Sequence, residues 1–88
     1  MPCYLISYDL RKQGQDYPEL HAAIKAYGTW AKITESFWAI VTENTAVEIR
    51  DALNKHLDEN DRLIVIKSGT EAAWTNAIAK AEWLKKYL

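Results

Sequence analysis

Apolar residues near the start of the chain predict a first β-strand over residues 3–10. Its central positions are almost all apolar or aromatic, which is typical of a strand that is buried on both faces. Side chains alternate between the two faces of a strand. One face therefore carries Leu5, Ser7 and Asp9, and the other carries Tyr4, Ile6 and Tyr8. We expect the tyrosine face to meet the helices of the fold.

Three later segments have the apolar spacing of helices. The first follows Asp16 and Glu19, whose spacing predicts a capping box, and ends at Gly28 as a left-handed cap. The second begins at a capping box of Thr45 and Glu48. The third is expected to open at residues 68–71 and to continue to the end of the chain. The inner stripes are Leu20, Ala23, Ile24 and Tyr27; Ala46, Ile49, Leu53 and Leu57; and Trp74, Ala77, Ile78, Ala81, Leu84 and Leu88.

Residues 29–41 are rich in β-branched and aromatic side chains and are too many for one typical strand, so we expect a hairpin that turns near Glu35 and Ser36. The apolar run at residues 62–67 predicts a last strand. This order of elements is typical of an α+β, ferredoxin-like βαββαβ sandwich, here with an extra C-terminal helix. The whole chain, residues 1–88, is expected to form this single domain. The third helix or a second copy of the chain must cover the sheet face that the first two helices leave open.

Composition limits the classes of function. Half of the chain (49%) is hydrophobic and the formal net charge is −1, so the sequence lacks the basic character of a general nucleic-acid binder. Cys3 is the only cysteine, which excludes an intramolecular disulfide and a cysteine-rich zinc site, and we expect it to be buried. No stretch has the length of a membrane span, and the first residues do not resemble a signal peptide. We therefore expect a cytoplasmic protein with no membrane contact.

Asp9 is the first candidate for chemistry, because it is an acidic residue near the end of an apolar strand. Burying an ionised carboxylate costs free energy unless it is paired or binds a cation. Arg11 and Lys12 follow in a polar loop, where they could bind phosphate or be ordinary solvated charges. The structural alternative for Asp9 is that it caps the loop or pairs with Arg11, Lys12 or a basic residue of a second copy.

Two histidines and one serine give weaker signals. His21 and His56 have no partner at metal-ligand spacing, so each is expected to be a surface or boundary residue. Ser36 belongs to no histidine and aspartate arrangement that the sequence can identify. A role in the turn is therefore favoured over a role as a nucleophile.

The four tryptophans divide into two pairs. We expect Trp38 and Trp74 to pack in the core or at an interface. Trp30 and Trp83 stay open, because they could equally pack or stack on nucleic-acid bases. A solvated helix face near the negative C-terminal end of the helix dipole is enough to explain the lysines of the last helix.

Three short motifs resemble one family of proteins. They are Tyr8-Asp9-Leu10 at the end of the first strand, Ala26-Tyr27-Gly28 at the end of the first helix, and Thr34-Glu35-Ser36-Phe37-Trp38 in the hairpin. Together they are similar to the small CRISPR-associated adaptation protein. They are more similar to its relatives labelled SinR-like, which have comparable Tyr-Asp-Leu-Arg-Lys and Leu-Asp-Glu-Asn-Asp runs. The resemblance covers about residues 4–66, and VapD-type toxin ribonucleases are similar at the level of the fold.

The resemblance implies a homodimer that packs sheet against sheet and brings the two copies of Asp9 face to face. Ser36 matches the serine near the hairpin turn of the family. Two facing aspartates repel each other, and a Mg²⁺ ion between them would relieve the repulsion and could activate water. The implied activity is metal-dependent cleavage of RNA or DNA. In the family, the first helix and the strand after it usually offer several arginines and lysines toward nucleic acid. In this sequence that strand offers only Lys32, and the first helix has one lysine and an acid.

Two functions therefore stay open. The first is a dimeric nucleic-acid-associated protein of the adaptation-protein type, a Mg²⁺-dependent endoribonuclease or endodeoxyribonuclease. In it Asp9 is the catalytic residue and metal ligand, and the residues in contact with nucleic acid are Arg11, Lys12 and Lys32. The second is a non-catalytic homodimeric protein-interaction module on the same fold, which the balanced charge, the acidic first helix and the surplus of aromatic residues favour.

Overall fold

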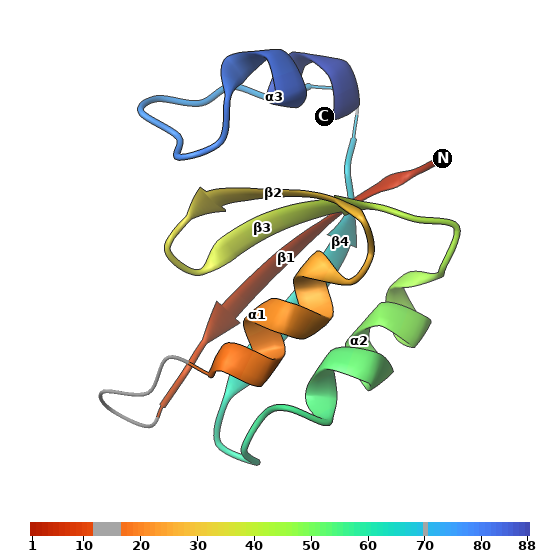
Figure 1. The fold of residues 1–88 in the computed structure, drawn as a ribbon, viewed down its shortest axis with the longest axis vertical. Coiled ribbons are helices and arrows are strands. Elements are labelled where there is room, and N and C mark those ends of the chain that lie inside the picture. Colours follow the sequence, from red (N-terminus) through yellow and green to blue (C-terminus); the bar gives the residue numbers. More distant parts are fainter. Residues whose placement is uncertain (12–16, 70) are drawn as a thin grey trace.

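The computed structural model of the protein describes residues 1–11, 17–69 and 71–88. It is an α+β structure in which a four-stranded antiparallel sheet has helices on both faces (Figure 1). The strands are β1 (Cys3–Asp9), β2 (Thr29–Thr34), β3 (Phe37–Val41) and β4 (Arg62–Lys67), and they lie side by side in the order β2-β3-β1-β4. The helices are α1 (Pro18–Lys25), α2 (Ala46–Asn54) and α3 (Ala81–Tyr87).

Strand β1 lies in the middle of the sheet, and its pairing determines what surrounds its end. The antiparallel register with β4 places Asp9 directly opposite Arg62. On the other side, the backbone N–H of Tyr8 donates to the carbonyl of Ser36 at 3.1 Å. The hairpin between β2 and β3 turns at Glu35 and Ser36, as predicted. The end of β1, the hairpin turn and the start of β4 therefore meet at one edge of the molecule.

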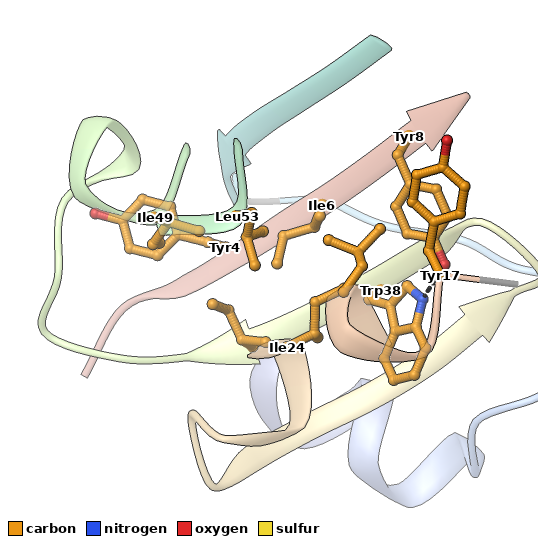
Figure 2. Close-up of a cluster of buried hydrophobic side chains, with 10 residues drawn as sticks. Tyr4, Ile6, Tyr8, Tyr17, Ile24, Trp38, Ile49 and Leu53 are labelled. Atoms are coloured by element: carbon orange, nitrogen blue, oxygen red, sulfur yellow. Dashed lines mark hydrogen bonds between the residues drawn. The ribbon is translucent and has the colours of Figure 1, made fainter. Parts of the chain in front are cut away.

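The first face of the sheet packs against α1 and α2 (Figure 2). Its buried core consists of Tyr4, Ile6, Tyr8, Tyr17, Leu20, Ile24, Trp38, Ile40, Ile49 and Leu53. The expectation that Tyr4, Ile6 and Tyr8 face the helices is confirmed. Trp38 is only 1% exposed, and its indole N–H donates to the Tyr8 hydroxyl at 3.0 Å. This bond matters because a buried donor without a partner is destabilising.

The helix starts follow the sequence at α2 but not at α1. The Thr45 Oγ1 accepts from the Glu48 N–H at 3.2 Å and the Glu48 Oε1 accepts from the Thr45 N–H at 2.8 Å, so the predicted capping box is confirmed. Helix α1 instead follows Tyr17, which has a left-handed φ of 47° and no side-chain cap. Asp16, the predicted cap of this helix, lies outside the described residues. Gly28 has the expected left-handed conformation, with φ 92°.

The third helix is shorter than predicted. It covers only Ala81–Tyr87, and its predicted start at residues 68–71 is wrong. Two features explain the difference. The backbone N–H of Ile78 donates to the carbonyl of Ile33 in β2 at 2.8 Å, so this segment bonds to the sheet edge rather than within a helix. Asn76 has a left-handed φ of 54°, which interrupts a right-handed helix.

Helix α3 and the segment before it cover part of the second sheet face. Leu84 is buried there against Cys3, Ile33, Ala39 and Val41, and Trp74, Trp83 and Tyr87 pack around this second core. Coverage does not extend to β4, where Ile64 and Ile66 share this face and are 53% and 50% exposed. The chain thus covers the face over β2 and β3 and leaves it open over β4.

Two expectations from composition can be compared with the structure. Cys3 is buried, as predicted, and burial raises the pKa of its thiol, so that it stays protonated. Among the described residues, no helix combines the length and the apolar character that crossing a bilayer requires.

Candidate functional site

Asp9 ends β1 with its carboxylate held between two arginines. Its Oδ2 accepts from Nη1 of Arg62 at 3.0 Å and from Nη1 of Arg11 at 3.5 Å. Pairing of Asp9 with Arg11 is one of the purely structural roles that the sequence leaves open for this carboxylate. The bond to Arg62 follows from the β1–β4 register. All three side chains are more than half exposed, and such pairs contribute only about 0–1 kcal/mol to stability. We call these three residues the arginine cluster.

Arg11 is positioned through its backbone. Its N–H donates to Asp61 Oδ1 at 2.8 Å, and the other oxygen of Asp61 accepts from the N–H of Asp58, also at 2.8 Å. The bond from Arg11 is the main reason that the pKa of Asp61 lies below its usual value. The buried Tyr17 hydroxyl donates to Asp58 at 3.2 Å. These bonds tie the segment after β1 to the turn before β4, while Lys12 lies outside the described residues.

A pocket of about 290 Å³ opens beside Asp9. We call it the strand-end pocket, and it is lined by Tyr8, Asp9, Leu10, His21, Lys32, Glu35 and Ser36. Lys32 and Glu35 form an exposed ion pair at 3.5 Å across its rim. The structure therefore brings Asp9, Lys32 and Ser36, which the sequence singles out separately, into one site.

His21 belongs to this site although the sequence predicts only a boundary position for it. Its Nε2 lies 3.1 Å from the Tyr8 hydroxyl, and its ring lies against Trp38 with centroids 5.6 Å apart. Burial raises the pKa of Tyr8, and the bond from Trp38 opposes that shift only in part. No local motif signals the pair, because His21 reaches Tyr8 only when α1 packs on β1. His56 is half-buried between α1 and α2, away from this pocket.

A second pocket, of about 270 Å³, lies at the free edge of β2. We call it the tryptophan pocket, and it is lined by Trp30, Ala31, Lys32, Ile78, Ala79, Lys80 and Trp83. The two tryptophans that the sequence leaves open thus line the same cavity. The packing expected for Trp38 and Trp74 is confirmed, since each joins one of the two cores. Lys32 lines both pockets and so connects them.

The two guanidinium groups at Asp9 suit an anionic ligand, and they lie beside a pocket whose own charges are those of Asp9, Lys32 and Glu35. Guanidinium and ammonium groups bind phosphate oxygens. Mg²⁺ needs several oxygen ligands, but Asp9 Oδ2 already contacts two guanidinium groups whose charge repels a cation. Within one copy, the described residues around Asp9 therefore do not fit Mg²⁺. No known protein-family profile matches the sequence.

Proposed function

We propose that this chain is a nucleic-acid-associated protein that binds backbone phosphates at the end of β1. The convergence of Arg11 and Arg62 on Asp9 carries the proposal. Two guanidinium groups flank the carboxylate of Asp9, and the planar guanidinium group is well suited to phosphate. Lys32, which pairs with Glu35 at 3.5 Å, lies in the neighbouring pocket and offers a further ammonium group. Because the whole chain has a net charge of −1, this local cluster rather than the overall charge attracts the ligand.

We also infer a ferredoxin-like arrangement and a homodimer. The strand order β2-β3-β1-β4, with α1 and α2 on the same face, supports this arrangement (Figure 1). A second copy would pack where α3 leaves the second face open, against the exposed Ile64 and Ile66. Such a dimer is offset toward β4, because α3 already occupies the face over β2 and β3. A cytoplasmic location is proposed with it, and the single, buried Cys3 is consistent with a reducing compartment.

The Mg²⁺-dependent nuclease stays a prediction that depends on the second copy. The two Asp9 carboxylates would have to approach each other and release their arginines before an ion could bind between them. Asp9 as a metal ligand and as a catalytic residue is therefore tied to the geometry of the dimer. Cleavage of RNA or DNA that requires Mg²⁺ and Asp9 would support it, and the phosphate-binding proposal does not depend on it.

A non-catalytic protein-interaction module is the second candidate function. The observation that favours this function is that the edge strand β4 carries the exposed Ile64 and Ile66. An apolar edge strand is a template for pairing with a strand of another chain. In this case the ion pairs of Asp9 are purely structural.

Fluorescence anisotropy with a labelled single-stranded oligonucleotide, measured over a range of salt concentrations, tests the proposed function. We expect Arg62→Gln and Lys32→Gln to weaken binding and each to reduce the slope of log K against log salt by about 0.7. Lys55→Gln is the matched control, because Lys55 lies outside the strand-end and tryptophan pockets. Failure of the wild type to bind at low salt, or an equal loss in Lys55→Gln, would overturn the proposal and favour the interaction module.

A further inference from the structure

We propose that the tryptophan pocket binds one unpaired base of single-stranded RNA or DNA. This inference rests on the proposed function and identifies the part of the nucleic acid that the chain recognises beyond its phosphates. Trp30 from β2 and Trp83 from α3 line the same cavity of about 270 Å³. Pockets for drug-sized ligands measure roughly 300–1,000 Å³, so this one suits a single planar ring system.

Both indole rings are held in place by neighbouring rings. Trp30 is 37% exposed and packs against the buried Trp38 with centroids 5.5 Å apart. Trp83 is half-buried and packs against Tyr87 at 4.7 Å. A ring that is already ordered loses little conformational freedom when a ligand stacks on it. The two walls of the pocket are therefore prepared for stacking.

The part of the pocket formed by the segment before α3 is also in place before a ligand binds. The hydrogen bond from Ile78 to the carbonyl of Ile33 fixes the segment before α3 against the edge of β2. The Ile78 side chain nevertheless stays 55% exposed, and it lines the pocket. Its apolar surface can therefore meet the flat, apolar face of a ligand.

Charge distinguishes a nucleobase from an apolar peptide as the occupant. Lys32 and Lys80 line the pocket, and Nζ of Lys25 lies 5.2 Å from the centre of the Trp30 ring. Aromatic rings surrounded by cations are typical of single-strand binding, in which bases stack while the backbone follows a positive groove. A peptide side chain would need the rings but neither the two lysines that line the pocket nor the third that lies over Trp30.

Lys32 connects this pocket to the rest of the proposed site, because it also lines the strand-end pocket beside Asp9. A single strand can place one base between Trp30 and Trp83 and a neighbouring phosphate at Lys32. The following phosphates then lie toward the arginine cluster. In a duplex the bases are stacked inside the helix, so the tryptophan pocket selects against it.

Anisotropy titrations with three matched probes test the inference. The probes are a labelled single strand, the same strand with abasic sites, and its duplex. Trp30→Leu and Trp83→Leu are expected to weaken binding of the intact single strand. The expected loss of affinity is about 5- to 150-fold, because each substitution removes the stacking of one base. They should hardly change binding of the abasic strand. Trp74→Leu is the control, since Trp74 packs in the same core as Trp83 without lining the pocket.

Circular dichroism checks that each variant folds, and Lys80→Gln provides a test that leaves both indole rings in place. We expect that variant to reduce the salt slope by about 0.7. If the wild type binds intact and abasic strands equally, and the tryptophan variants bind like it, the pocket is refuted while phosphate binding stands. If the wild type binds no strand, both proposals fail. Saturable binding of N-acetyltryptophanamide without any base-dependent binding would assign the pocket to a protein partner and refute the inference.

Discussion

Replacing Tyr8 by phenylalanine removes one hydroxyl group that joins β1, β3 and α1. That hydroxyl accepts the indole N–H of Trp38 at 3.0 Å (Figure 2). It also lies 3.1 Å from His21 Nε2. The ring itself stays in the core, so the substitution leaves almost no cavity. The main consequence is a buried indole N–H without a partner, which costs about 1–3 kcal/mol. We expect the free energy of unfolding to fall by about 2 kcal/mol.

For a domain of this size that loss lowers the melting temperature by about 10 °C. Urea unfolding followed by far-ultraviolet circular dichroism measures the free energy directly. Tyr4→Phe is the matched control, because Tyr4 is buried on the same face of β1 and its hydroxyl has no hydrogen bond to any described residue. We expect that variant to change stability by less than about 0.5 kcal/mol, as substitutions away from special features do.

A double-mutant cycle with Trp38→Phe isolates the bond between the two side chains. Once the indole is gone, Tyr8→Phe no longer leaves an indole N–H unpaired, so it should cost less in that background. We expect a coupling energy of about 1–2 kcal/mol. The interpretation is refuted if Tyr8→Phe costs as little as Tyr4→Phe, or if its cost is the same with and without Trp38.

Three further predictions concern other parts of the structure. Leu84→Ala should destabilise the protein by about 2–5 kcal/mol in urea unfolding, because it empties the contact between α3 and the second sheet face; a much smaller loss would mean that α3 is not docked there. The pKa of Tyr17 is raised from 10.0 to about 12 by burial and by the nearby carboxylates of Asp58 and Asp61. The contribution of Tyr17 to stability is therefore present below pH 10 and is lost as the pH rises toward 12. Urea unfolding at a series of pH values measures this alkaline loss of stability, which should be smaller in Tyr17→Phe. Asp9→Asn should release both arginines and tighten oligonucleotide binding in anisotropy measurements, and weaker binding would contradict the role of the arginine cluster. The magnesium hypothesis further predicts that the same substitution abolishes cleavage that EDTA inhibits.

Local patterns predicted most elements of this fold, because each depends on residues that are close in sequence. The alternation along β1, the capping box of Thr45 and Glu48 and the turn at Ser36 are examples. The start of α3 could not be predicted in this way. The apolar stripe of residues 74–88 continues as if helical, but Ile78 bonds to β2, a partner that no local pattern reveals.

The candidate site shows the same division. Asp9 could be selected from the sequence because an acid at the end of an apolar strand is unusual. Arg62 and His21 could not, because each joins the site only through tertiary pairing. The first lies opposite Asp9 in the β1–β4 register, and the second reaches Tyr8 from α1. The role of the Asp9 carboxylate in catalysis stays a prediction.

The path of a single strand across the molecule can be tested most directly by NMR. In a ¹H–¹⁵N spectrum titrated with a short single-stranded oligonucleotide, we predict shifts for the indole signals of Trp30 and Trp83 and for the backbone signals of Arg11 and Arg62. The indole signal of Trp74 should stay in place. Shifts confined to the β4 edge, or an unchanged spectrum at low salt, would contradict the proposed binding path.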